Sequence, residues 1–371
     1  MSMHLVLFFT RGVSLRTWSM IGNLDREIAL YHFLIEHGVK ISFVTYGNST
    51  DLNYADRLGG IRILCNETDL PLEQFERRLF SLHGSAIKTA DVIKTNQTYG
   101  GELALWGARL LSKPLIARCG YMWSFNAAAE NGDNSSAAAE ARRVEAKVFG
   151  AADRVVVTTN EMQMNILKRF PQIADRVLVI PNYVDTELFK PTNGVKRERT
   201  LLFVGRIAPE KNLEALLEAV RALQMNLTIV GEGKLRPKLQ KEFADLRDRV
   251  LWEGNVPNSQ LPKYINESTI FVLPSFYEGH PKALLEAMAC GAPVLGTDSP
   301  GIRELIRHGN TGYLCGTDSE DIRLALRELL TRPTLLKELG SNARQYVVEN
   351  YSLTKIGNME LNMLKEVADR Q

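Results

Sequence analysis

The sequence lacks the features of membrane-spanning, secreted and zinc-stabilised proteins. No run of about 18 consecutive apolar residues occurs, which excludes a transmembrane helix. The first residues, MSMHLVLFFTRG, have no basic n-region and do not resemble a signal peptide. The four cysteines, Cys65, Cys119, Cys290 and Cys315, have no C-x-x-C spacing that would indicate a zinc site, and they do not form a disulfide framework. These absences predict a cytoplasmic protein.

An excess of charge of either sign is also absent. Lys and Arg together number 45 and Asp and Glu 43, which gives a formal net charge of +2. Binding to a nucleic-acid backbone needs a basic face, so we expect no nucleic-acid partner. The hydrophobic content of 45% and the charged content of 24% are those of an ordinary globular protein. The length of 371 residues corresponds to about two domains.

Short apolar runs alternate with helical patterns along the whole chain, which is typical of βαβ units and parallel sheets. A proline-, asparagine- and charge-rich segment, Pro181–Arg199, is typical of an interdomain linker. The sequence therefore predicts a domain over residues 1–185, a second over 186–351, and an amphipathic helix over 352–371. Two doubly wound domains present the carboxyl ends of their strands to a shared cleft, where we expect the site.

The strands that the apolar runs predict fall into two series. They are His4–Thr10, Lys40–Tyr46, Arg62–Cys65, Val92–Thr95, Leu115–Arg118 and Arg154–Thr158 in the first series, and Leu201–Val204, Asn226–Val230, Val250–Glu253, Ile270–Leu273 and Pro293–Gly296 in the second.

The most informative stretch, residues 275–294, follows a predicted buried strand. Pro281 suits the first position of a helix, and Gly291 ends that helix after about three turns. A strand, a turn and a short helix direct backbone N–H groups and a positive helix end to one place, which suits an anion such as a diphosphate. Glu278 and Glu286 flank the helix start, where carboxylates accept hydrogen bonds from vicinal hydroxyls of a sugar or a ribose.

This stretch, E-G-H-P-K-A-L-L-E-A-M-A-C-G-A-P-V, closely resembles the signature of the retaining glycosyltransferases of family 4. Further matches to the family fall in the expected order, and they include Val204-Gly205-Arg206, Gly231-Glu232-Gly233, Gly254-Asn255-Val256 and Pro181-Asn182-Tyr183-Val184-Asp185. The resemblance implies an α/β protein of the GT-B fold, in which two Rossmann-like, doubly wound domains face a central cleft. The N-terminal domain would bind the acceptor and the C-terminal domain the nucleotide sugar.

The resemblance also implies roles for individual residues. Arg206 and Lys211 would neutralise the diphosphate, Glu278 would bind the donor sugar, and Glu286 the ribose. Glu278, Arg206 and Lys211 form the catalytic set. The remaining donor contacts that it implies are Gly12, Val256, Gly279, His280, Pro281, Lys282, Ala283 and Leu284.

The implied activity is transfer of a sugar from a nucleoside diphosphate to an acceptor hydroxyl with retention of configuration, by a hexosyltransferase of polysaccharide or glycoconjugate biosynthesis. The chain has no D-x-D triplet, so we expect no metal, and no cofactor besides the donor substrate. The acceptor would be a glycan or a lipid-linked glycan, with peripheral contact to the inner face of the membrane.

Two alternatives to this activity remain. An epimerase or hydrolase of the same fold would release product without an acceptor, and a noncatalytic sugar-nucleotide-binding module would be expected to have lost at least one of the four charged site residues.

Three features of the N-terminal half leave alternatives open. Cys119 stands where many relatives have a histidine, and we expect it to face the cleft as a spectator. Tyr121, Trp123 and Phe125 alternate after a predicted strand, which indicates either a sugar-stacking platform or a structural cluster. Asn126–Ala141 shows no apolar periodicity before Ala137, which predicts a loop that leads into a helix.

Overall fold

The computed structural model describes residues 3–192 and 199–369, and the chain divides into two compact units. Unit 1 comprises Met1–Met20, Arg26–Pro181 and Gly357–Gln371, and unit 2 comprises Ile21–Asp25 and Asn182–Ile356. Part of the predicted linker, residues 193–198, lies outside the described residues, as do residues 370 and 371 of the predicted C-terminal helix.

The division between the units differs from the predicted boundary at residue 185. Asn182 is the first residue of this stretch in unit 2, and the chain returns to unit 1 at Gly357. The backbone explains why Val184 belongs to unit 2. Its N–H donates to the carbonyl of Tyr351 at 2.9 Å, and its carbonyl accepts from the N–H of Leu353 at 2.9 Å.

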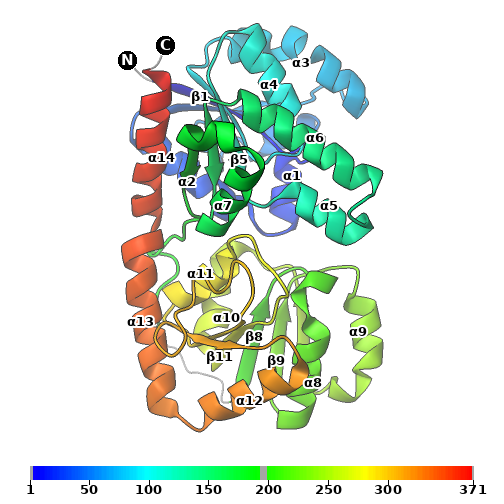
Figure 1. The fold of residues 1–371 in the computed structure, drawn as a ribbon, viewed down its shortest axis with the longest axis vertical. Helices are drawn as coiled ribbons and strands as arrows, with labels where there is room; N and C mark the ends of the chain where they lie inside the picture. Colours follow the sequence, from blue (N-terminus) through cyan, green and yellow to red (C-terminus); the bar gives the residue numbers. More distant parts are fainter. Residues whose placement is uncertain (1–2, 193–198, 370–371) are drawn as a thin grey trace. The chain divides into compact units, whose positions relative to one another are not determined.

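Within the described residues, unit 1 contains a seven-stranded parallel sheet in the order β3-β2-β1-β4-β5-β6-β7. The strands are β1 (His4–Phe8), β2 (Lys40–Val44), β3 (Arg62–Leu64), β4 (Val92–Thr95), β5 (Leu115–Cys119), β6 (Arg154–Val157) and β7 (Val177–Val179). The helices are α1 (Leu15–Met20), α2 (Leu24–Glu36), η1 (Ser49–Tyr54), α3 (Leu72–Ile87), α4 (Gly101–Leu110), α5 (Trp123–Asn131), α6 (Ser136–Ala151), α7 (Asn160–Arg169) and η2 (Pro171–Arg176), and α14 (Leu353–Ala368) joins them (Figure 1).

Unit 2 contains, among the described residues, a six-stranded parallel sheet in the order β10-β9-β8-β11-β12-β13. The strands are β8 (Thr200–Val204), β9 (Asn226–Val230), β10 (Val250–Gly254), β11 (Ile270–Leu273), β12 (Val294–Thr297) and β13 (Tyr313–Cys315). The helices are η3 (Pro209–Lys211), α8 (Leu213–Leu223), α9 (Arg236–Glu242), η4 (Ala244–Leu246), η5 (Asn258–Gln260), α10 (Leu261–Glu267), α11 (Lys282–Ala289), α12 (Ser319–Leu330) and α13 (Pro333–Tyr351).

Both sheets are doubly wound, because the strand order reverses beside the first strand of each unit. In unit 1 the reversal lies between β1 and β4, and in unit 2 between β8 and β11. The central strands are apolar and buried, as parallel strands covered on both faces must be. Ligands of such sheets bind outside the carboxyl ends of the strands at the reversal point.

The sequence prediction located eleven strands to within a few residues but missed two. The missed strands, β7 and β13, have three residues each and lie at sheet edges. Short, half-buried runs of this kind lack a periodic signal. The loop predicted over Asn126–Ala141 was wrong, because α5 and α6 occupy most of it. Small alanine side chains let these two helices pack closely, so the segment needs no stripe of large apolar residues.

A buried ion pair fixes the last helix to the sheet of unit 1. The Nζ atom of Lys94, on β4, lies 2.6 Å from Oε2 of Glu360, on α14. The two side chains are 1% and 3% exposed. Burial lowers the pKa of the Lys94 ammonium, and the neighbouring Glu360 carboxylate opposes this effect. Neither charge can be removed alone without leaving the other uncompensated in the core.

We therefore predict that Glu360→Gln lowers the free energy of unfolding by about 3–5 kcal/mol, as expected when a buried charge loses its partner. The matched control is Glu366→Gln on the same helix. Glu366 is 61% exposed and 3.8 Å from Arg154, so this change should cost less than about 1 kcal/mol. Urea unfolding of both variants measures the difference, and equal losses would contradict the role of the buried pair.

Candidate functional site

The sequence-predicted residues of unit 2 lie where its strand order reverses. Gly205–Lys211 follows β8, and Pro274–Lys282 connects β11 to α11. These two strands are neighbours in the sheet. A backbone hydrogen bond from Phe276 to the carbonyl of Glu210, 2.9 Å long, joins the two loops. The site is therefore built at the place where a doubly wound sheet binds its ligands.

The loops after β8, β9 and β10 touch through their backbones. The N–H of Gly205 donates to the carbonyl of Val230 at 3.0 Å, and the N–H of Ile207 donates to the carbonyl of Glu232 at 2.9 Å. The N–H of Gly231 donates to the carbonyl of Gly254 at 2.7 Å. A Cβ atom at Gly231 would overlap the carbonyl of Gly205, and the φ of Gly231 is +132°, which L side chains rarely adopt. Glycine is therefore required there, and the G-E-G stretch forms a turn that seats the β8 loop.

Lys211 and Glu278 form an ion pair at the centre of this site. Lys211 Nζ lies 2.6 Å from Glu278 Oε1, which also accepts a hydrogen bond from Ser275 Oγ at 2.7 Å. Both charged side chains are largely buried, at 13% and 11% exposure. The cation and the carboxylate that the sequence assigned to different parts of a ligand thus neutralise each other in this structure.

Glu286 is buried inside the second turn of α11, with 2% exposure. Its Oε1 atom accepts a hydrogen bond from Asn258 Nδ2 at 2.8 Å. Asn258 is itself buried, and its backbone N–H donates to Gly22 in the segment Ile21–Asp25 at 2.9 Å. Glu286 is therefore a buried, hydrogen-bonded carboxylate and not a solvated residue on the helix surface. Asn258 was missed, because nothing in the sequence indicates which asparagine faces a given carboxylate.

The signature loop around Gly279 and His280 is held by neighbours from outside the signature. A Cβ at Gly301 would overlap the carbonyls of Glu278 and Gly279, and Glu278 N–H donates to Pro300 at 2.9 Å. Asn182 Nδ2 donates to the His280 carbonyl at 2.7 Å. Asn182 at the start of the predicted linker, and Pro300 and Gly301 in the loop after β12, therefore set the conformation of the signature loop.

The remaining predicted donor residues differ in their surroundings. Pro281 is the N-cap of α11, and Leu284 is fully buried in the core. Lys282 Nζ lies 5.8 Å from the centre of the Tyr183 ring, the residue that replaces the usual glycine of the linker motif. Ala283 is half-buried. Helix α11 carries its positive end toward the loop that contains Glu278.

Arg206 and Val256 each contact residues other than the Lys211–Glu278 pair. The Arg206 side chain is 75% exposed and lies 2.9 Å from Glu210. Val256 is half-buried, and its carbonyl lies against Gly22. Gly12 belongs to unit 1, has a φ of +77°, and has open space where a side chain would be.

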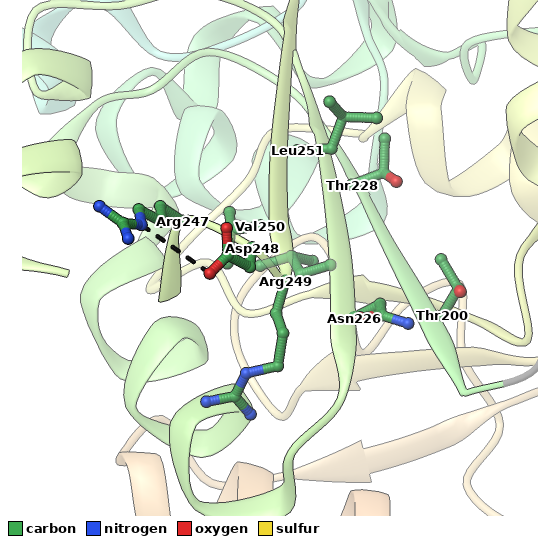
Figure 2. A pocket seen from close by; sticks show the side chains of 9 residues that line it. Thr200, Asn226, Thr228, Arg247, Asp248, Arg249, Val250 and Leu251 are labelled. Carbon is green, nitrogen blue, oxygen red and sulfur yellow. Dashed lines mark ion pairs between the residues drawn. The ribbon is translucent and has the colours of Figure 1, made fainter. Parts of the chain in front are cut away.

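A separate cavity of about 350 Å³ lies at the amino ends of β8, β9 and β10 (Figure 2). Thr200, Asn226 and Thr228 contribute polar side chains to it, and Arg247 lies 3.8 Å from Asp248, with both side chains more than 80% exposed. None of the predicted site residues lines this cavity. The paired charges and tight loops that are typical of a ligand site lie at the carboxyl ends of the strands, not at this cavity. Residues of the cavity therefore serve as control substitutions in the predictions below.

The expectation that Cys119 faces the cleft was wrong. Its side chain is fully buried in the core of unit 1, and Sγ donates to the carbonyl of Tyr121 at 3.1 Å. Burial raises the pKa of the thiol to about 12. Trp18, on α1, is also buried, and it stacks on Phe9 with 4.2 Å between ring centres.

Across residues 3–192 and 199–369, no group of three or more His, Cys, Asp or Glu side chains is arranged to hold a metal ion. In the same residues, no helix is long and apolar enough to cross a membrane.

Two family models match adjoining parts of the chain. The model "Glycosyltransferase Family 4" matches residues 28–188, and "Glycosyl transferases group 1" matches residues 184–346. Together they cover most of both units.

Curated relatives include bacterial sugar transferases. D-inositol 3-phosphate glycosyltransferase of Thermomonospora curvata is 30% identical over 286 residues, 68% of this chain and 66% of the relative. Alpha-maltose-1-phosphate synthase of Mycolicibacterium smegmatis is 28% identical over 255 residues, 61% of this chain and 66% of the relative. The match spans just under two thirds of the length of these relatives.

Solved structures share the fold at low sequence identity. Sucrose-phosphate synthase of Thermosynechococcus elongatus has a TM-score of 0.78 and 19% identity, with both chains covered completely. Anabaena HepE in complex with UDP has a TM-score of 0.80 and 16% identity, covering 98% of this chain and 100% of HepE. The two parallel-sheet units are therefore those of the GT-B fold.

We predict that Cys119 resists alkylation by iodoacetamide in the folded protein at pH 7.5, because a buried thiol with a pKa near 12 forms almost no thiolate. Cys119→Ser should fold with a loss of about 1 kcal/mol or less, since the hydroxyl can donate to the same carbonyl. Peptide mass spectrometry with and without urea measures the labelling. Rapid labelling of Cys119 in the native protein would contradict its burial.

Proposed function

Because the chain belongs to glycosyltransferase family 4, we propose that it transfers a hexosyl group from a nucleoside diphosphate sugar to an acceptor hydroxyl with retention of configuration. The observation that carries this proposal is the arrangement beyond the carboxyl ends of β8 and β11. Lys211 and Glu278 lie in connections of fixed backbone, and Glu286 lies in the second turn of α11. The names of the two curated relatives above describe a glycosyl transfer and the synthesis of a glycosyl phosphate.

The proposed roles follow the surroundings of each side chain. Glu286 accepts hydrogen bonds from the ribose hydroxyls, because its position is fixed by Asn258 and its carboxylate is an acceptor only. Lys211 and Arg206 neutralise the diphosphate, and Glu278 accepts hydrogen bonds from the donor sugar. The exposed Arg206 side chain must leave Glu210 and Lys211 must leave Glu278 to do so.

In the proposed reaction, the acceptor oxygen forms a bond to the anomeric carbon while the bond from that carbon to the diphosphate oxygen breaks. The acceptor proton passes to the leaving diphosphate on the same face. Cys119 takes no part, because it is buried and protonated. Two cations supply the charge that a metal supplies in other enzymes, so we propose a reaction without metal or further cofactor.

We place the acceptor in unit 1 and propose that it is a glycan or a lipid-linked glycan of polysaccharide or glycoconjugate synthesis. One curated relative, 26% identical over 289 residues, is named as a galactosyltransferase that acts on a diphosphoundecaprenol-linked sugar in Escherichia coli. Work on such an acceptor takes place at the membrane surface, so we propose a cytoplasmic protein with peripheral membrane contact. A panel of nucleoside diphosphate sugars, tested by thermal shift and then by turnover, identifies the donor. Absence of a shift with every donor would contradict the proposed function.

The two carboxylates should separate binding from turnover. Glu286→Gln should weaken binding of the free nucleoside diphosphate by roughly 10- to 100-fold, the loss of a charge-assisted hydrogen bond. Glu278→Gln should bind the nucleoside diphosphate as tightly as the parent or more tightly, because Lys211 loses its competing carboxylate. The same variant should turn over more slowly. Titration calorimetry measures both affinities. The control is Glu214→Gln, because the Glu214 side chain on α8 is 56% exposed. Parent-like affinity of Glu286→Gln would refute the ribose assignment.

Loss of the cations should affect the transition state more than the fold. Lys211→Ala and Arg206→Ala should each cost roughly 2–4 kcal/mol of transition-state stabilisation in kcat/KM, the scale of one preorganised charge donor. Arg247→Ala, in the separate cavity, is the matched control and should leave kcat/KM unchanged. Activity should persist with a chelator, and strict dependence on an added divalent ion would contradict the metal-free reaction.

A further inference from the structure

A buried network of three polar side chains lies at the start of α5 in unit 1. Glu145, on α6, accepts hydrogen bonds from the backbone N–H of Ser124 at 2.8 Å and from its hydroxyl at 2.7 Å. Arg169, at the end of α7, lies 2.8 Å from the same carboxylate and donates to Ser124 Oγ at 3.0 Å. Glu145 is completely buried, Ser124 is 2% exposed, and the Arg169 side chain is 25% exposed.

This network caps the first turn of α5, which the residue before the helix does not do. The N-cap of α5 is Met122, whose side chain accepts no hydrogen bond from the first turn. The carboxylate of Glu145 instead satisfies a free N–H of that turn and lies at the positive end of the helix. A carboxylate buried this deeply is tolerated only in one well-satisfied geometry, so the network fixes how α5 begins.

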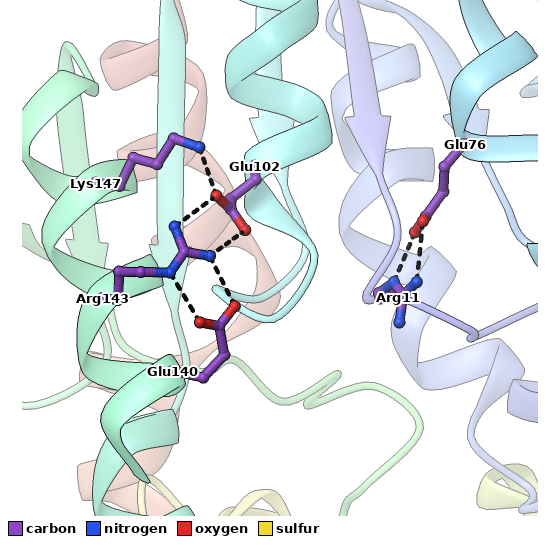
Figure 3. Close-up of polar contacts among 6 residues, drawn as sticks. All are labelled: Arg11, Glu76, Glu102, Glu140, Arg143 and Lys147. Carbon is purple, nitrogen blue, oxygen red and sulfur yellow. Dashed lines mark hydrogen bonds and ion pairs between the residues drawn. The ribbon is translucent and has the colours of Figure 1, made fainter. Parts of the chain in front are cut away.

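The residue that begins α5 is Trp123, directly before Ser124. Its ring is half-buried, with its centre 4.7 Å from that of Tyr99 and a 55° angle between the planes. Tyr99 follows β4, and its carbonyl accepts from the N–H of Arg11, after β1, at 3.3 Å. Arg11 in turn forms a two-bonded ion pair with Glu76 (Figure 3). The loops after β1, β4 and β5 are therefore connected.

These loops lie at the carboxyl ends of the strands beside the reversal point of the unit 1 sheet, where doubly wound sheets bind ligands. They carry two aromatic faces, Tyr99 and Trp123, and an amide, Gln97, which accepts from the N–H of Gly120 at 2.8 Å. A sugar ring has an apolar C–H face and a rim of hydroxyls. Aromatic faces beside an amide complement that chemistry.

We propose that the Glu145–Ser124–Arg169 network positions Trp123, and that the indole face of Trp123 contacts the ring of a carbohydrate acceptor. Glu145 and Arg169 are then positioning residues, and Trp123 determines specificity for a sugar ring over a simple alcohol. This inference rests on the proposed glycosyl transfer, but it concerns residues of unit 1 that the donor site does not use.

The contact is tested on the full chain saturated with its preferred nucleoside diphosphate. The probes are methyl glycosides of common hexoses, detected by saturation-transfer NMR. Trp123→Ala should weaken binding of the best glycoside roughly three- to tenfold, the change that an aromatic contact supports. Phe125→Ala, two residues further along the same helix and 48% exposed, should leave binding unchanged. Unchanged binding by Trp123→Ala would overturn the proposal.

The positioning role is tested through the indole N–H resonance of Trp123. Glu145→Gln and Arg169→Gln should shift this resonance and weaken glycoside binding, whereas Arg169→Lys should restore part of both. The matched control is Arg143→Gln, also on α6, where Arg143 pairs with Glu102 and Glu140 in an exposed network (Figure 3). If Glu145→Gln lowered stability but changed neither the indole resonance nor glycoside binding, the network would be purely structural. That result would overturn its positioning role.

Nucleotide binding distinguishes a failure of this inference from a failure of the proposed function. Every variant should bind the nucleoside diphosphate like the parent, because none of the changed residues is among the proposed donor contacts. A parent that binds no nucleoside diphosphate would refute the glycosyl transfer itself. A parent that binds the nucleotide but gives no saturation transfer to any glycoside would overturn the carbohydrate contact alone.

Discussion

The backbone contact between the loops after β8 and β9 is the constraint on which the site in unit 2 depends. Gly231 lies so close to the carbonyl of Gly205 that no side chain fits between them. The hydrogen bond from Ile207 to Glu232 continues this contact, and the same loop ends at Lys211. The position of the lysine is thus set by the backbone before any ligand binds, as preorganised electrostatic stabilisation requires.

The charges of the site are already paired inside the protein. Lys211 has Glu278 as its partner, and Arg206 has Glu210. In the proposed function a diphosphate replaces these carboxylates, so part of the attraction between the cations and the ligand is offset by the loss of the internal pairs. Glu286 differs, because its partner Asn258 is a neutral donor that holds the carboxylate without neutralising it. The proposed donor site therefore combines one carboxylate held by a neutral donor with two cations that are already paired with carboxylates.

The sequence predicted the parts of this structure that local patterns determine. The apolar runs predicted most strands, and Pro281 and Gly291 predicted the two ends of the helix at the reversal point. Asn258 could not be predicted, because its contact with Glu286 joins positions far apart in the chain. The burial of Cys119 was also missed, since the last residue of a parallel strand can point to the core as readily as to solvent.

The most direct test of the donor site is hydrogen exchange of the backbone amides with and without the nucleoside diphosphate that gives the largest thermal shift. The account predicts slower exchange in Gly205–Lys211, in Gly231–Gly233 and in the loop Glu278–Lys282, and no change in Arg247–Leu251 beside the separate cavity. Slower exchange at Arg247–Leu251, with none at the carboxyl ends of β8 and β11, would contradict the assignment of the site.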